Sequence, residues 1–395
     1  MPVHDHDPQR VAEIMLGWLN LELVSCSKLQ TLWAGYGHIC ALEARSPHSS
    51  TTQHLILKLV SPPPAPQPQD EGHVRKMLSY QVEQFWYDEL APKLGSDVAV
   101  ARCLVSTRSR RDRAVADGID GLIATIMTDL RLRFPVAGHK TRSLAPAQVH
   151  AALDWLACFH GSSKCWLPRH RHGFLGPPLQ EADGPRVQGL WRNGGYTYLA
   201  TRRREYGSLA ADDENEWSHA FCRPGADGQP PLAEQVATFL IPRGRAWETC
   251  IHGDVKSENL FATKAGDEVA FFDFQYVGLG LGVCDVAKLF TGSVPLHMLA
   301  DLPVPARELS MGAGERALLE RYRAKLVSQQ PTLEYDWDSL VRHWETALVD
   351  WCRFQASWGF WGNTGWLQAR VRCILGDGGW REWLRREGLQ GGDKS

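Results

Sequence analysis

Two short polar segments near the middle of the chain constrain its fold more than any other feature. The first, His-Gly-Asp-Val-Lys-Ser-Glu-Asn, covers residues 252–259, and the second, Asp-Phe-Gln, covers residues 273–275. Between them, Leu260–Ala262 and Val269–Phe272 have the apolar character of two buried strands joined by a short turn. We therefore predict a hairpin that places the end of the first segment beside the start of the second.

The residue types in these segments suit the transfer of a phosphoryl group. Asp254 can accept or orient the proton of a hydroxyl group. Asn259 and Asp273 offer the oxygen ligands that the hard Mg²⁺ ion requires. The alternative is a strand-rich loop whose acidic residues only cap turns, but the spacing and the flanking apolar strands favour a site.

Residues 249–290 resemble the catalytic core of the protein-kinase-like superfamily, and most of all its small-molecule branch. That branch includes aminoglycoside phosphotransferases, choline kinases and ecdysteroid kinase-like proteins, in which His-Gly-Asp replaces His-Arg-Asp and Asp-Phe-Gln replaces Asp-Phe-Gly. The resemblance implies an α+β, two-lobed protein-kinase-like fold with a small β-rich N-terminal lobe and a larger, mainly helical C-terminal lobe. It also implies ATP and Mg²⁺ as cofactors.

The same resemblance assigns roles to residues of the two segments. Asp254, His252 and Lys256 occupy the catalytic positions, and Lys256 would offset charge on the phosphoryl group in transfer. Asn259 and Asp273 occupy the metal-binding positions. Asp285 resembles the aspartate that opens the next helix, where its side chain would cap that helix and hold the catalytic loop.

Upstream residues are consistent with a nucleotide-binding lobe. Leu29–Glu43 has the pattern of a strand, a glycine turn containing Gly35 and Gly37, and a second strand. His54–Val60 is an apolar strand that contains Lys58, and a buried lysine needs a partner because an isolated buried charge is costly. The alternative is a lysine at a sheet edge whose charged end reaches water.

The resemblance supplies partners for Lys58, namely the phosphates of ATP and a glutamate on a helix. Glu83 is our candidate for that glutamate, and Glu89 is the competing acid. Gly121–Met127 is typical of a buried strand, after which Asp129 and Leu130 resemble the hinge that meets adenine. We predict lobes at residues 1–127 and 128–395, with the hinge at about 128–131.

Composition limits the classes of partner. The chain has 395 residues, 43 of them basic and 45 acidic, so a net charge of −2 gives no cationic field for nucleic acid or an anionic membrane. We expect the arginines at 108–113 and 202–204 to lie on solvated faces. The first residues lack an apolar signal-peptide core, no run of about 18 apolar residues occurs, and the cysteines form no Cys-x-x-Cys pair. These features predict a cytoplasmic protein.

The acceptor pocket is expected between the long insertion at residues 161–244 and the tryptophan-rich C-terminal part. Four tryptophans recur every seven residues, which keeps them near one helix face. A packed core face is the favoured interpretation, and an aromatic ligand cage is the alternative. The weakest candidates for substrate contact are four aromatic residues of this region: Trp351, Phe354, Trp358 and Trp361.

The sequence predicts a kinase that transfers the γ-phosphate of ATP to a small hydroxylated acceptor, which is choline-like, sterol-like or aminoglycoside-like. A protein Ser/Thr kinase is the first alternative, supported by Lys256 but opposed by the long interval between Leu130 and His252. A catalytically silent kinase-like module and a nucleotide hydrolase are the others. The oligomeric state stays open.

Overall fold

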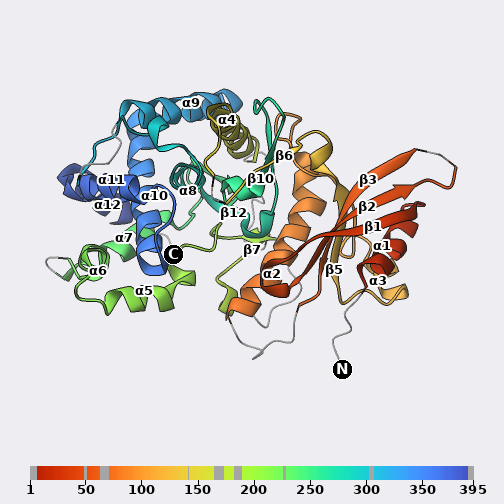
Figure 1. The fold of residues 1–395 in the computed structure, drawn as a ribbon. Helices are drawn as coiled ribbons and strands as arrows, with labels where there is room; N and C mark the ends of the chain where they lie inside the picture. Colours follow the sequence, from red (N-terminus) through yellow and green to blue (C-terminus); the bar gives the residue numbers. More distant parts are fainter. Residues whose placement is uncertain are drawn as a thin grey trace.

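The computed structural model describes residues 7–48, 51–62, 71–140, 142–163, 173–181, 189–225, 228–301 and 307–389. The N-terminal part is built on an antiparallel sheet and the C-terminal part is mainly helical, as Figure 1 shows. This arrangement confirms the predicted α+β, protein-kinase-like fold. In the described part of the chain no helix is long and apolar enough to cross a membrane.

The N-terminal sheet has five strands in the order β1-β2-β3-β5-β4, and every neighbouring pair is antiparallel. Its core side packs against helix α1 (Pro8–Gly17), which begins with Asp7 as its N-cap. The strands are β1 (Glu22–Thr31), β2 (Gly37–Arg45), β3 (Thr52–Val60), β4 (Cys103–Ser106) and β5 (Ile123–Thr128). Short α3 (Arg111–Ala116) completes this part.

Helix α2 (Glu71–Phe85) lies between this sheet and the central segment of the C-terminal part (Figure 1). It continues into a wider helical turn at Trp86–Leu90, where Trp86 is fully buried and stacks on Phe274 at 3.5 Å between ring centroids. A helix that contacts the sheet on one side and residues 274–276 on the other couples the two parts of the molecule.

The C-terminal part encloses the larger hydrophobic core. At its centre, Trp344 is fully buried and packs against Phe290 and Trp366. The helices are α4 (Pro146–Ser163), α5 (Arg203–Ala210), α6 (Glu216–Cys222), α7 (Leu232–Leu240), α8 (Val283–Gly292), α9 (Ala313–Gln329), α10 (Trp337–Trp358), α11 (Thr364–Gly376) and α12 (Gly378–Leu389).

Two small sheets position the polar segments. One has the order β11-β10-β6 and the other β7-β8-β12-β9. Their strands are β6 (Val136–Ala137), β7 (Phe174–Leu175), β8 (Leu190–Trp191), β9 (Glu248–Ile251), β10 (Leu260–Ala262), β11 (Val269–Phe271) and β12 (Gly278–Leu281). The segment 252–259 therefore connects β9 to β10, and the segment 273–275 follows β11.

Candidate active site

The predicted hairpin is present. Strands β10 and β11 pair antiparallel with Leu260 opposite Phe271, and the backbone N–H of Phe272 donates to the carbonyl of Asn259 at 3.0 Å. Asn259 and Asp273 therefore lie at the same end of the hairpin. Asp273 itself has φ of 68° and ψ of 57°, a left-handed conformation that is uncommon for a residue other than glycine and is often found at functional sites.

Lys58 is held by two carboxylates. Its Nζ lies 2.6 Å from Oε2 of Glu83 and 3.1 Å from Oδ1 of Asp273, so strand β3, helix α2 and the 273–275 segment meet at one ammonium group. Burial opposes the charge on Lys58, but the two carboxylates raise its pKa and keep it protonated. Its ion pairs are inconsistent with a lysine that only reaches into water.

The structure distinguishes the two candidate glutamates. Glu83 has a side chain that is 6% exposed and faces Lys58. Glu89 has a side chain that is 50% exposed and pairs instead with Arg108. The glutamate of the Lys58 ion pair is therefore Glu83.

Asp254 is the centre of a second cluster of polar side chains. The amide Nδ2 of Asn259 donates to Oδ2 of Asp254 at 3.1 Å and to its backbone carbonyl at 2.9 Å. Nζ of Lys256 lies 3.2 Å from the same Oδ2. The Asp254 carboxylate thus has a fixed orientation beside the positive charge of Lys256. Burial disfavours that charge, but the negative charge of Asp254 raises the pKa of Lys256.

Both predicted metal ligands have one atom engaged by the protein. Oδ1 of Asp273 accepts from Lys58 and Gln275, and the amide nitrogen of Asn259 is used by Asp254. The other oxygens of these two side chains are the hard donors that Mg²⁺ takes. Although burial disfavours the charge, Lys58 and Gln275 lower the pKa of Asp273, so this predicted ligand is ionised. The described residues contain no cluster of three His, Cys, Asp or Glu that could hold a metal by itself.

Two such ligands fit Mg²⁺ that is shared with phosphate. This ion commonly binds to one or two protein side chains, with substrate phosphate oxygens and water as its further ligands. The donor set of Asn259 and Asp273 is therefore compatible with the cofactor pair predicted from the sequence, MgATP.

The rear of the catalytic loop is held by Asp285. Its buried carboxylate accepts the backbone N–H of His252 at 2.6 Å and that of Gly253 at 3.0 Å. Nε2 of His160 lies 3.2 Å away. The expected grip on the loop is found, but the expected cap on α8 is not, because the N-cap position is Gly282 and no side chain caps that end. The carboxylate faces the loop instead of its own helix.

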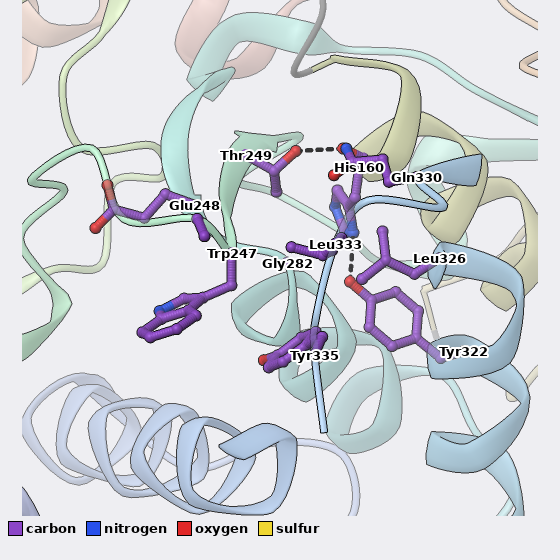
Figure 2. Close-up of a pocket in the computed structure, with 11 residues that line it drawn as sticks. His160, Trp247, Glu248, Thr249, Gly282, Tyr322, Leu326, Gln330, Leu333 and Tyr335 are labelled. Carbon is purple, nitrogen blue, oxygen red and sulfur yellow. Dashed lines mark hydrogen bonds between the residues drawn. The ribbon is translucent and has the colours of Figure 1, made fainter. Parts of the chain in front are cut away.

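Figure 2 shows the other side of this network, where Nδ1 of His160 contacts the hydroxyl of Tyr322 at 2.9 Å. A small pocket lies here, lined in part by Trp247, Tyr322 and Tyr335, with room for about one water molecule. Its lining contains none of the residues predicted to bind ATP, the metal or the acceptor. It is a gap behind the catalytic loop.

His252 contacts both its own loop and the core, and its Nδ1 accepts the backbone N–H of Asp254 at 3.3 Å. Its ring is fully buried, and Nε2 lies 2.9 Å from the carbonyl oxygen of Phe272. Burial lowers the pKa of His252, so the ring stays neutral at physiological pH. A catalytic role for His252 remains a prediction. The contacts in this structure are those of a residue that joins the loop to strand β11.

Gly35 and Gly37, the two glycines of the N-terminal turn, are required for different structural reasons. Gly35 has φ of 74°, and a Cβ there would meet no atom within 4 Å, so the backbone conformation alone requires it. At Gly37 a Cβ would overlap the carbonyl of Leu59 in the neighbouring strand. Their contact with nucleotide phosphates remains a prediction.

At the predicted hinge, the side chain of Asp129 is occupied locally. It accepts from the backbone N–H of Arg131 at 2.9 Å and pairs with the same residue's guanidinium at 2.6 Å. Leu130 begins the short helical turn that follows β5. Any contact of Asp129 with adenine would therefore involve its backbone. The contact of Leu130 with adenine and the lobe boundary at 127/128 stay predictions.

The heptad tryptophans divide between core and surface. Trp344 is in the core, as the favoured interpretation expects, and Trp351 is 7% exposed. Trp358 is 56% exposed and Trp361 is 39% exposed. Phe354 is buried and lies between Trp351, at 5.3 Å between ring centroids, and Trp358, at 6.2 Å. Their contact with an acceptor remains a prediction.

One expectation about the arginines is wrong. Arg202 does not lie on a solvated face, since only 3% of it is exposed. Its guanidinium lies over three rings, with its central carbon 5.1 Å from the ring centroid of Tyr196, 5.8 Å from that of Phe354 and 5.0 Å from that of Trp358. Aromatic faces attract a guanidinium, which allows the charge to be buried here. Arg203 and Arg204 are exposed, as expected.

Sequence reasoning did not identify the segment that lies beside the catalytic loop. Within the insertion, Gly194 N–H donates to the carbonyl of Leu279 at 2.7 Å, and Gly195 N–H donates to that of Tyr276 at 2.9 Å. These bonds place Tyr196 4.6 Å from Tyr276, between ring centroids. The paired glycines were the only available signal, because they permit close backbone contact.

Comparison with known proteins agrees with the resemblance. A model of the phosphotransferase enzyme family matches residues 48–326. Among solved structures, the chain is similar to a choline kinase from Streptococcus pneumoniae, at 11% identity and a TM-score of 0.44, with coverage of 97% of this chain and 98% of that one.

Two further solved structures are similar to the chain. A Plasmodium vivax ethanolamine kinase is 13% identical, with 96% and 93% of the two chains covered and a TM-score of 0.44. A macrolide 2'-phosphotransferase from Brachybacterium faecium is 13% identical, with 96% of each chain covered and a TM-score of 0.43. No curated protein matches the chain. Because the family model covers more than half of its residues, the chain belongs to the phosphotransferase enzyme family.

Proposed function

We propose that the protein is an ATP-dependent kinase that phosphorylates a hydroxyl group of a small molecule. The observation that carries this proposal is the convergence of Lys58, Glu83 and Asp273 beside the pair formed by Asp254 and Asn259. A turn-capping role would not require a buried lysine from another sheet at the same point. The family match favours a small acceptor over a protein substrate.

Each residue has a defined part in the proposed reaction. Lys58, which Glu83 holds in place, would bind phosphate oxygens of the nucleotide. Asn259 and Asp273 would hold the metal ion. When bound, MgATP supplies the phosphoryl group, and the metal ion offsets charge on the phosphate oxygens. Asp254 would orient the acceptor hydroxyl and accept its proton, and Lys256 would stabilise negative charge nearby.

Thermal unfolding with and without MgATP tests the nucleotide site. A ligand that binds only the folded protein stabilises it by about 2.7 kcal/mol at a concentration of 100 times Kd. We expect MgATP to raise the melting temperature of the wild type, and we expect Asp273→Asn to lose that shift because it removes a charged metal ligand. Glu89→Gln is the matched control, since its exposed side chain lies outside the Lys58 ion pair.

The outcomes separate the competing functions. Absence of a MgATP shift in the wild type would contradict the proposal and favour a catalytically silent module. A shift that is equal in Asp273→Asn would remove Asp273 from the metal site. Phosphate release that proceeds at the same rate with and without hydroxylated acceptors would identify a nucleotide hydrolase instead.

A further inference from the structure

Three residues share the face of α2 that lies toward the catalytic segment, residues 249–290. Arg75, Ser79 and Glu83 are spaced four residues apart, so they form a line along the helix. Glu83 contacts Lys58, and the hydroxyl of Ser79 donates to Oε1 of Gln275 at 3.1 Å. Arg75 is the next residue in this line, one helical turn before Ser79.

Arg75 has unused hydrogen-bonding capacity. Its Nε is buried, and no described residue accepts a hydrogen bond from it. A buried N–H of a charged group without an acceptor is unfavourable by about 1–3 kcal/mol or more, so an acceptor from outside the chain would be stabilising. Arg75 as a whole is partly exposed, so its guanidinium can be reached from solvent.

A second guanidinium, that of Arg202, approaches the same place from the insertion. Nε of Arg202 donates to the carbonyl of Tyr196 at 2.8 Å, and Nη1 pairs with Glu205 at 3.2 Å. Burial lowers the pKa of Arg202, and the positive charge of Arg75 lowers it further, so the two guanidiniums are electrostatic neighbours.

The tyrosine pair connects both arginines to Asp254. Tyr196 and Tyr276 lie together at 4.6 Å. Burial raises the pKa of Tyr276, Asp254 raises it further, and Arg75 and Arg202 oppose the rise. The nearby acids already have partners: Asp254 pairs with Lys256, Asp273 with Lys58 and Glu205 with Arg202.

We propose that Arg75 and Arg202 form an anion-binding subsite beside Asp254, which binds a phosphate or carboxylate group of the acceptor. The proposal rests on the proposed function and narrows its substrate class to hydroxylated acids and phosphate esters. Neighbouring guanidiniums repel each other, and an anion bound between them relieves that repulsion. Guanidinium groups bind phosphate and carboxylate through paired hydrogen bonds.

The same geometry disfavours a choline-like acceptor. A quaternary ammonium group would need the free faces of aromatic rings. The faces of Tyr196, Phe354 and Trp358 are already approached by the guanidinium of Arg202. A cationic acceptor would therefore meet an occupied cage and a like charge.

Binding of inorganic phosphate tests the subsite without any acceptor. The protein is saturated with MgADP, and phosphate is titrated at constant ionic strength while thermal stability is followed. Tetramethylammonium is the cationic probe. We expect phosphate to stabilise the wild type and tetramethylammonium to have no effect. Arg75→Gln should weaken phosphate binding at least about tenfold because one charged donor is lost, and Arg75→Lys should weaken it less.

Arg204→Gln is the matched control, because Arg204 is exposed at the start of α5. A phosphate effect that is equal in wild type and Arg75→Gln, or equal losses in Arg75→Gln and Arg204→Gln, would overturn the proposal. So would the absence of a phosphate effect, or stabilisation by tetramethylammonium. The MgADP shift of each variant is measured separately, so failure of the nucleotide site is distinguished from failure of the subsite.

A second titration separates the acceptor from the nucleotide as the source of the anion. The protein is saturated with a non-hydrolysable MgATP analogue, which fills the γ-phosphate position. Phosphate binding that persists under this condition supports a site for the acceptor. Phosphate binding that is lost means that the arginines contact the γ-phosphate, which would overturn the assignment to the acceptor.

Discussion

The catalytic segment and the wall around Arg202 are neighbours built in opposite ways. The catalytic segment, residues 249–290, is one short stretch whose polar side chains pair with one another and with Lys58. The wall, formed by Tyr196, Arg202, Tyr276, Phe354 and Trp358, combines the insertion, the segment after β11 and helix α10. The proposed chemistry thus lies within one stretch of the chain, whereas the wall is assembled from distant parts of it.

The largest effect should come from Asp254 in the catalytic segment. Asp254→Ala removes the proposed proton acceptor, and we expect turnover to fall at least about 1,000-fold with little loss of folding, since the side chain lies at the edge of the core. Acceptor-dependent ADP formation measures this, with Asp267→Ala in the exposed hairpin turn as the control. Near-normal activity in Asp254→Ala would refute the catalytic assignment.

Asp285→Ala should lower the stability of the protein, because the catalytic segment is also part of the core. The substitution leaves the N–H groups of His252 and Gly253 and a ring nitrogen of His160 without their buried partner. We expect the free energy of unfolding to fall by about 3 kcal/mol or more. Chemical denaturation measures the change, and Asp285→Asn should have a smaller effect. Unfolding curves that match the wild type would mean that the loop is held elsewhere.

Trp358→Ala should weaken acceptor binding at the wall and leave nucleotide binding unchanged. The ring is largely exposed and contacts Arg202, so its loss should weaken a contact of about 0.5–1 kcal/mol. Among acceptors that support turnover, KM should rise severalfold while KM for ATP stays constant. Val115→Ala is the control, because this exposed side chain lies on α3, outside the wall and the nucleotide site. An equal change in both KM values would mean that the wall and the nucleotide site are not separate.

The last prediction concerns pH and the helix that carries part of the wall, and its effect is the smallest of the four near neutral pH. His343 on α10 is buried, and burial together with Arg245 lowers its pKa to about 3. The folded protein keeps this ring neutral while the unfolded chain binds a proton below about pH 6.5. Stability from His343 is therefore complete above about pH 6.5 and is lost as pH falls toward 3, by at most about 1.4 kcal/mol per pH unit.

Unfolding measured across this range in wild type and His343→Asn isolates that contribution. The Asn variant should have a shallower decline in stability between pH 6.5 and 4 because it cannot take up the proton. Identical slopes in the two proteins would show that other groups cause the acid sensitivity.

The catalytic segment could be predicted because its polar residues are separated by short intervals in the sequence. The interval from Asn259 to Asp273 matches a hairpin, and one lysine in an apolar strand required a carboxylate partner. The choice of Glu83 over Glu89 needed the structure, since both are on consecutive helical turns and only the fold shows which one faces β3.

The wall could not be predicted, because no local pattern marks it. Arg202 is the first of three consecutive arginines, and its burial follows from ring contacts with residues more than a hundred positions away. The tryptophan spacing on α10 showed which residues share a face, but the same face passes from core at Trp344 to surface at Trp358.

The contact between Gly195 and Gly253 has a consequence for how such an enzyme can change its substrate. Both residues have positive φ, and a Cβ on Gly253 would lie 2.6 Å from the backbone nitrogen of Gly195. Even one methyl group would therefore force the insertion away from the catalytic loop. Substitution at this junction should therefore be costly, and we expect changes of acceptor to arise at outer positions such as Arg202 and Trp358.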